Sequence, residues 1–238
     1  MSPGNPDPVI HVVAAAVMDA AGRVLIAQRP AGKHMAGGWE FPGGKLEPGE
    51  ERLAGLEREL REELGISIIG TPRPLIRVRY AYTSREVLLD IWVVKSYSGE
   101  ARGLDGQALR WCTQEELEAA ELLPADKPIV RALRLPERLR QMASRYYCVG
   151  DLRDLSSLGR SAALTDAANA PRLRGVICAS ADEGSAAARA GADFLVIREA
   201  LAEEELKALC RTVSVPVYAT GVAPEKAWEL GASGVSEI

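Results

Sequence analysis

The stretch GKLEPGEERLAGLERELREELGI, residues 44–66, decides the fold of the first half of this chain. Within it, leucines at positions 53, 56, 60 and 64 recur at spacings of three and four residues. This spacing is typical of an amphipathic helix that buries one apolar stripe. Gly65 follows the last leucine, at a position where glycine commonly ends a helix. The pattern therefore predicts a helix over residues 51–64.

Three glutamates of this helix, Glu59, Glu62 and Glu63, occupy positions i, i+3 and i+4. Carboxylates at these spacings share one edge of the helix, and each like-charge pair costs roughly a few tenths of a kcal/mol. A divalent cation would reverse that cost, and Mg²⁺ prefers hard oxygen ligands of this kind. For the glutamates alone, the more common arrangement is a solvated acidic face that Arg58 and Arg61 neutralise.

The spacing of the whole stretch resembles the catalytic box of the Nudix hydrolases, G-x₅-E-x₇-R-E-U-x-E-E-x-G-U, in which U is aliphatic. All nine specified positions match, and background residue frequencies give such a match about once in 10⁹ positions. The matching residues are Gly44, Glu50, Arg58, Glu59, Leu60, Glu62, Glu63, Gly65 and Ile66. The resemblance implies an α/β/α sandwich in which the box forms a loop-helix-loop metal site.

The same resemblance implies roles for individual residues. The metal would be Mg²⁺, with Mn²⁺ as the alternative, and Arg58 would brace the acidic cluster. The implied metal ligands are Gly43, through its carbonyl, Glu59, Glu62 and Glu63. The implied catalytic residues are Arg58, Glu59, Glu62, Glu63 and Asp105. The reaction would be attack of water on a phosphorus with metal assistance, and a carboxylate would take the proton.

Beyond the box, residues 9–135 resemble the MutT branch, which hydrolyses oxidised purine nucleoside triphosphates such as 8-oxo-dGTP to the monophosphate and pyrophosphate. The segments that carry this likeness are VLIAQR at 24–29, KHMA at 33–36, WEFPGGK at 39–45, GQ at 106–107 and LPADKP at 123–128. The substrate-binding residues that it implies are Arg29, His34, Glu40, Phe41, Pro42, Gly43 and Asp126. Plainer interpretations stay open, in which Arg29 pairs with an acid and Phe41 packs in the core.

Asp126 departs from the pattern of the MutT branch, which has asparagine in the matching segment. An amide reads a purine edge with one donor and one acceptor, whereas an ionised carboxylate can only accept hydrogen bonds. Burial would raise the pKa of Asp126 and keep it protonated, which would restore a donor. The identity of the substrate therefore depends on the surroundings of this side chain.

Composition excludes several other classes of function. The chain has 238 residues with 29 Lys plus Arg against 33 Asp plus Glu, so no positive excess indicates a nucleic-acid polymer as partner. Its four cysteines lie far apart and predict buried, reduced thiols. The apolar run at 9–18 is too short to span a bilayer. We therefore expect a cytoplasmic protein with a small nucleotide substrate and no membrane partner, and a homodimer is an open alternative.

The remaining first half predicts a mixed sheet, a long loop and two short helices. The capping-box sequence that starts at Thr113 predicts a short helix. A second helix is expected at 126–133, and residues 136–144 are expected to form a helical linker. The expected strands are 9–18, 23–29, 75–82 and 87–95, with a Gly- and Pro-rich loop over 30–48.

Residues 145–238 alternate short apolar strands with Ala-rich helices, a pattern that predicts parallel βα units. The strands are expected at 146–149, 175–177, 194–197, 215–218 and 234–235, and the helices at 181–190, 202–212 and 224–230. RYYCVGD at 145–151, GADFL at 191–195 and VPVYATG at 215–221 resemble thiamine-phosphate synthase, a TIM-barrel enzyme. Five strands are too few for a closed barrel. We therefore expect an incomplete TIM-barrel-like βα domain that has lost synthase catalysis.

The sequence thus predicts an α/β chain with a Nudix domain at 1–135, a linker at 136–144 and a truncated βα domain at 145–238. The leading functional expectation is a Mg²⁺-dependent pyrophosphohydrolase of oxidised purine nucleotides such as 8-oxo-dGTP. Two alternatives are a Nudix hydrolase of a thiamine-related diphosphate and a non-catalytic nucleotide-binding module.

Overall fold

The computed structural model describes residues 9–33, 35–83, 85–143, 147–151 and 172–238. These residues form two compact units. The first unit holds the residues before 73 together with 78–128, and the second holds 73–77 and the residues from 129 onwards. The predicted domain limits at 135 and 145 fall within the second unit, and they remain predictions about which segments fold independently.

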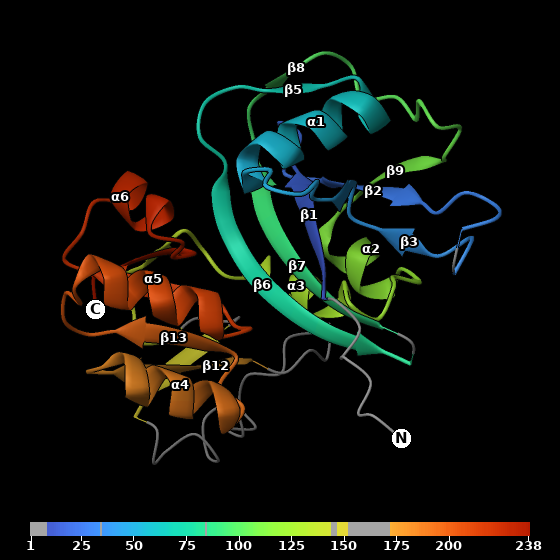
Figure 1. The fold of residues 1–238 in the computed structure, drawn as a ribbon. Helices are drawn as coiled ribbons and strands as arrows, with labels where there is room; N and C mark the ends of the chain where they lie inside the picture. Colours follow the sequence, from blue (N-terminus) through green and yellow to red (C-terminus); the bar gives the residue numbers. More distant parts are fainter. Residues whose placement is uncertain (1–8, 34, 84, 144–146, 152–171) are drawn as a thin grey trace. The chain divides into compact units, whose positions relative to one another are not determined.

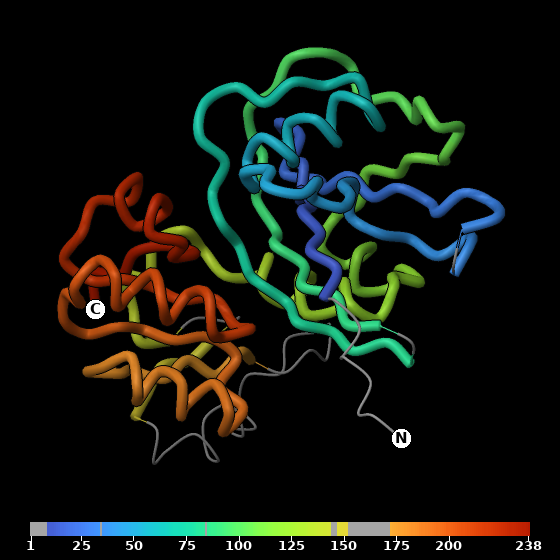
Figure 2. The backbone as a smooth tube through the Cα atoms, viewed as in Figure 1, coloured from blue at the N-terminus to red at the C-terminus, as the bar shows by residue number. Residues whose placement is uncertain are grey.

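The first unit is built on a four-stranded mixed sheet with the strand order β4-β1-β7-β6. Strand β1 runs parallel to β7 and antiparallel to β4, as the mixed sheet expected from the sequence requires. Figures 1 and 2 show β6 and β7 as two long curved strands that run side by side. The bounds are β1 Ile10–Val17, β4 Gly43–Lys45, β6 Arg73–Tyr82 and β7 Arg85–Val94, and the first five residues of β6 are counted with the second unit.

A smaller three-stranded sheet, β3-β2-β9, corrects two expectations. Strand β2 (Val24–Gln28) pairs with β3 (Trp39–Glu40) and β9 (Leu109–Cys112), not with the strands of the mixed sheet. The expected loop over 30–48 therefore contains two short strands, β3 and β4. The reason is that backbone groups held in a partly buried loop need partners, and neighbouring strands supply them. A further two-stranded ladder joins β5 (Ser67–Ile68) and β8 (Tyr97–Ser98).

Helix α1 (Arg52–Leu64) covers one face of the mixed sheet and confirms the predicted helix (Figure 1). Gly65 ends it in the left-handed conformation, with φ of 69°, as a glycine cap does. The leucines at 56, 60 and 64 are fully buried against the sheet. Leu53 was expected on the same stripe but is 39% exposed. Leu46 from the preceding loop packs at this end of the helix, against Gly55, and takes that place in the core.

Two short helices complete the first half of the chain. Helix α2 (Gln114–Ala119) begins with the predicted capping box, in which the Thr113 hydroxyl accepts from the Glu116 N–H and the Glu116 carboxylate accepts from the Thr113 N–H. Helix α3 (Lys127–Ala132) confirms the second predicted helix. Asp126 directly precedes α3, so the start of this helix sets the position of the Asp126 backbone.

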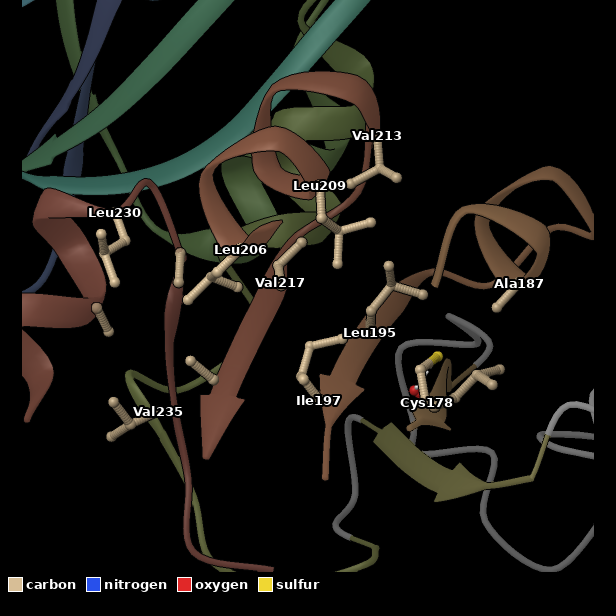
Figure 3. Packing of buried hydrophobic residues seen from close by; sticks show 14 of the residues in the cluster. Cys178, Ala187, Leu195, Ile197, Leu206, Leu209, Val213, Val217, Leu230 and Val235 are labelled. Carbon is tan, nitrogen blue, oxygen red and sulfur yellow. Dashed lines mark hydrogen bonds between the residues drawn. The ribbon is translucent and has the colours of Figure 1, made fainter. Parts of the chain in front are cut away.

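The second unit contains a six-stranded sheet in the order β10-β15-β14-β13-β12-β11, in which every pairing is parallel. An open sheet of this kind confirms an incomplete barrel. Leu206 and Leu209 of α5 pack towards the sheet residues Leu195 and Val217 (Figure 3). The bounds are β10 Arg138–Leu139, β11 Tyr147–Gly150, β12 Leu173–Cys178, β13 Phe194–Ile197, β14 Val217–Thr220 and β15 Gly234–Ser236, with helices α4 Ala181–Arg189, α5 Glu203–Thr212 and α6 Pro224–Glu229.

Strand β10 shows that the helical linker expected at 136–144 is wrong. Leu139 in this strand is fully buried, and β10 pairs with β15 from the far end of the chain. The carbonyl of Pro136 accepts a hydrogen bond from the Tyr218 hydroxyl at 2.5 Å. The local sequence has little strand character, so pairing with a distant strand overrides it. The sheet consequently has six strands where five were expected.

Cys112, Cys148 and Cys178 are free and buried, while Cys210 is free and half-buried. Among the residues that the structure describes, none of the helices is both long enough and apolar enough to span a membrane.

Candidate active site

Arg58 is the hub of a network of ion pairs on helix α1. Its guanidinium donates to both carboxylate oxygens of Glu50 at 2.9 Å, to Glu59 at 2.9 Å and to Glu62 at 3.2 Å. It also donates to the carbonyl of Lys45 at 3.2 Å. Contact with Arg58 lowers the pKa of Glu50 to about 2 and so keeps this carboxylate ionised. Arg58 therefore makes the contacts with the acidic cluster that its predicted bracing role needs, and the role itself remains a prediction.

Glu63, on the same helix, contacts strand β4, which leads into the box. Its carboxylate accepts the N–H of Gly43 at 3.2 Å. Burial raises the pKa of Glu63 to about 7, and the charges of Glu59 and Glu40 act in the same direction. The Gly43 hydrogen bond and the charge of Lys33 oppose that rise. Glu63 is thus a largely desolvated acid whose ionised form needs neighbouring positive charge.

A polar cleft opens beside Glu63. Four of the residues predicted for the site meet there, namely Glu40, Pro42, Glu63 and Asp105. Sequence reasoning assigned no role to the other lining residues, which are Ala27, Gln28, Pro30, Lys33 and Gln107. The first half of the chain therefore gathers acids from a strand, a helix and a loop around one opening.

Gln107 connects two of these acidic segments. Its amide oxygen accepts the backbone N–H of Asp105 at 2.9 Å, and its amide N–H₂ donates to the backbone carbonyl of Glu63 at 3.1 Å. The N–H of Leu104 donates to the same carbonyl at 2.9 Å. The loop at 102–107 therefore caps the end of α1 and holds Asp105 beside it. The GQ pair at 106–107 was the only sequence signal for this contact.

The carboxylate oxygens of Glu59, Glu62 and Glu63 are hard ligands of the kind that Mg²⁺ prefers. Gly44 provides a specific fit, because a Cβ atom at this position would lie 2.3 Å from the Glu59 carboxylate. Only glycine therefore lets that carboxylate approach the backbone of the box. Across the described residues, no three His, Cys, Asp or Glu side chains surround a common point where an ion would fit. Arg58 instead takes up the charges of Glu59 and Glu62, and Glu62 is 60% exposed.

The Nudix resemblance assigns Glu59, Glu62 and Glu63 as the residues that would hold Mg²⁺, with the Gly43 carbonyl as a further ligand, and the structure brings Gly43 into contact with Glu63. A bound Mg²⁺ would supply neutralising charge on phosphate oxygens and a more acidic water. The assignment of these ligands remains a prediction. Arg58 would then release part of its contact with Glu59 and Glu62 and keep its two bonds to Glu50.

Gly44→Ala is expected to lower kcat by about 10²-fold while the protein stays folded, since the new methyl group displaces the Glu59 carboxylate. The obstructing atoms belong to the end of a flexible side chain, which can move. Pyrophosphate release and the thermal unfolding midpoint would be measured for both proteins. A variant with unchanged turnover would show that the position of Glu59 is not critical.

A second polar cluster surrounds Asp126. This residue is 4% exposed, and the backbone N–H of Phe41 donates to its carboxylate. Burial raises the pKa of Asp126 well above 3.8, and the nearby charge of Glu40 raises it further, while Arg29 opposes the rise. Arg29 itself pairs with Glu40 at 3.0 Å. Asp126 is therefore held in the environment that favours its protonated form, as the sequence-based hypothesis required.

Phe41 and His34 are two further residues that were predicted to bind the substrate. Phe41 is 3% exposed, so its ring packs within the protein while its backbone contacts Asp126. His34 lies outside the described residues. Tyr82, which sequence reasoning did not single out, accepts a hydrogen bond from the backbone N–H of Ala125. Burial raises the pKa of Tyr82, and the nearby Asp126 raises it further. The only sequence signal for Tyr82 was an aromatic residue at the end of a predicted strand.

Asp126→Asn is expected to flatten the pH dependence of stability. Because the pKa of Asp126 is raised in the folded state, the folded protein binds this proton more tightly than the unfolded chain. The resulting stabilisation is complete below the ordinary pKa of 3.8 and is lost as the pH rises through the folded-state pKa. Urea unfolding of both proteins should show the free energies diverging with pH in favour of the variant. Parallel curves would contradict the raised pKa.

Comparisons with known proteins agree with this geometry. A family model described as NUDIX domain matches residues 13–132. A CTP pyrophosphohydrolase of Escherichia coli is 41% identical over 121 residues, which cover 50% of this chain and 88% of that protein. An 8-oxo-dGTP diphosphatase of the same organism is 36% identical over 114 residues, which cover 47% of this chain and 85% of that protein. The solved MutT protein of Methanosarcina mazei shares the fold, with a TM-score of 0.50, 22% identity and coverage of 55% of this chain and 96% of that chain.

This chain therefore belongs to the Nudix family. Within the family it is a Nudix hydrolase similar to the 8-oxo-dGTP diphosphatases. These matches concern the first half of the chain, and the likeness of residues 145–238 to thiamine-phosphate synthase stays a prediction.

Proposed function

We propose that this chain is a Mg²⁺-dependent nucleoside triphosphate pyrophosphohydrolase that converts oxidised purine nucleotides such as 8-oxo-dGTP to the monophosphate and pyrophosphate. The observation that carries the choice of base is the burial of Asp126 beside Glu40. A carboxylic acid kept neutral offers one O–H donor and one carbonyl acceptor. It can therefore replace the amide that the MutT branch uses at this position.

The edge of 8-oxoguanine suits such an acid. Oxidation at C8 converts N7 from an acceptor into an N–H donor, next to the O6 acceptor. Unmodified guanine presents N7 and O6 as two acceptors. Neutral Asp126 can satisfy the first pattern with both of its groups and the second with only its O–H. The proposed discrimination against dGTP therefore comes from one buried proton.

A second candidate substrate is CTP. The pairing edge of cytosine places the N3 acceptor beside the N4 donor, which is the same order that a neutral carboxylic acid complements. Similarity to the CTP pyrophosphohydrolase of Escherichia coli, at 41% identity, supports this alternative. Both candidates share the reaction and differ in the base and in the sugar, which is deoxyribose in 8-oxo-dGTP and ribose in CTP.

In this proposal, residues at one end of the site bind the base and residues at the other end bind the phosphates. Asp126, held by the Phe41 N–H, would orient the base. The acids around Glu63 and Asp105 line the cleft that would receive the phosphates. Arg58, which is ion-paired to Glu50 on one side, would keep Glu59 and Glu62 directed to the same edge of α1. A nucleotide bound this way would span from Asp126 to Glu63, with Glu40 near both.

With Mg²⁺ present, pyrophosphate release would be measured for 8-oxo-dGTP, dGTP, CTP and dCTP. Phosphate release would be measured for thiamine diphosphate, because cleavage of its diphosphate bond yields the monophosphate and orthophosphate. The proposal expects kcat/KM for 8-oxo-dGTP to exceed that for dGTP by at least about 10²-fold, since one unmatched polar contact in a buried site costs this much or more. Preference for CTP would select the second candidate. Hydrolysis of thiamine diphosphate alone would overturn both, and no hydrolysis with retained nucleotide binding would indicate a binding module.

A further inference from the structure

We propose that Lys33 is a phosphate-binding residue of this site and that its ammonium group holds the diphosphate portion of a nucleoside triphosphate. This inference rests on the proposed function only in requiring a triphosphate, because it does not depend on which base is bound. Lys33 lies in the loop between β2 and β3, outside the catalytic box.

The location of Lys33 is the first observation. Its side chain lines the cleft that also contains Glu63 and Asp105. Among the described residues that line this cleft, Lys33 is the only one with a positive charge. Asp126, at the base end of the site, does not line it. Lys33 therefore lies at the end of the site where acidic residues and phosphates would meet.

The electrostatic balance of the cleft is the second observation. Glu40, Glu63 and Asp105 bring three carboxyl groups to its wall, and a nucleoside triphosphate adds several negative charges. A metal ion neutralises only part of the combined charge, so a cationic side chain at this wall lowers the remaining repulsion.

The third observation concerns what Lys33 does in the folded chain. Among the residues that the structure describes, its ammonium forms no ion pair or hydrogen bond, and the side chain is exposed. Arg29 and Arg58, by contrast, are held by carboxylates at 2.9–3.0 Å. An ammonium group without a protein partner can give its three donors to phosphate oxygens. Structural ion pairing with the described residues therefore does not account for Lys33, and its three donors are available to a ligand in the cleft.

Titration calorimetry with inorganic pyrophosphate and Mg²⁺ tests the proposal without any turnover. Lys33→Ala is expected to weaken pyrophosphate binding about tenfold, the effect of losing a charge-assisted hydrogen bond. Binding of the monophosphate products 8-oxo-dGMP and CMP should change by less than about twofold. Lys33→Arg keeps the positive charge and should restore most of the pyrophosphate affinity.

The matched control is Lys226→Ala, which removes the same charge from a lysine paired with Glu203 in the second unit. It should leave pyrophosphate affinity unchanged, so that a general effect of net charge is excluded. Equal pyrophosphate affinity in wild type and Lys33→Ala would overturn the proposal. Weakened binding of the monophosphates with unchanged pyrophosphate binding would also overturn it. Failure of the 8-oxo-dGTP assignment alone would leave this result intact, because pyrophosphate carries no base.

Discussion

Glu63→Gln is expected to lower kcat by about 10²–10⁴-fold without unfolding the protein. The amide has the size of the carboxyl group, and its oxygen can still accept the Gly43 N–H that Glu63 accepts at 3.2 Å. What the substitution removes is the negative charge, and with it the strongest oxygen ligand that this buried position can offer to Mg²⁺. The substitution therefore tests the chemical role of the Glu63 charge separately from the packing of its side chain. The rate of pyrophosphate release at saturating substrate is the measurement.

Glu57→Gln is the matched control for this experiment. Glu57 lies on the same helix, pairs with Arg61 at 2.6 Å and accepts the N–H of Ile68 at 2.8 Å. The change of charge is identical, but Glu57 does not line the cleft. Its kcat should stay within about twofold of wild type. Normal turnover in Glu63→Gln, or an equal loss in both variants, would contradict the role assigned to Glu63.

Asp126→Ala is expected to reduce kcat/KM for the preferred nucleotide by about 10²-fold or more and to reduce discrimination between bases. The methyl side chain removes both the donor and the acceptor that a neutral carboxylic acid presents. It also leaves the Phe41 N–H without its buried partner, which costs about 1–3 kcal/mol of stability. Hydrolysis of 8-oxo-dGTP, dGTP and CTP at equal concentrations would show the loss of selectivity directly.

Asp126→Asn distinguishes a hydrogen-bonding role from a general loss of packing. The amide keeps one acceptor and supplies donors, so selectivity should be retained to within about tenfold. Its activity should also depend less on pH, because the variant has no proton to lose at this position. An alanine variant that discriminates between bases as wild type does would remove Asp126 from substrate recognition.

Much of the first half of this chain could be predicted because its signals are local. The leucine spacing and Gly65 gave helix α1 to within one residue of its start, and the Thr113 capping box gave α2. The box also brought Arg58 and the three glutamates to one edge of a helix. Residues three and four apart are neighbours on any helix, so this arrangement needed no tertiary information.

Other features could not be predicted because they depend on distant segments. Strand β10 forms by pairing with β15 almost a hundred residues later, against its own weak propensity. Leu53 is exposed because a loop residue, Leu46, fills the neighbouring space. The assignment of β2 to a second sheet follows from its pairing with β9. In each case the partner could not be read from the local pattern.

The sequence by itself determined the class of chemistry, because all nine positions of the Nudix box are present and they include Glu59, Glu62 and Glu63 on one edge of a helix. The tertiary structure decided the burial of Asp126, which raises its pKa, and the location of Lys33. Burial and Coulomb interactions depend on which distant segments meet, because solvent exclusion and separation set their strength. Phe41 and Glu40 approach Asp126, and Glu63 lines the same cleft as Lys33, only after the chain has folded.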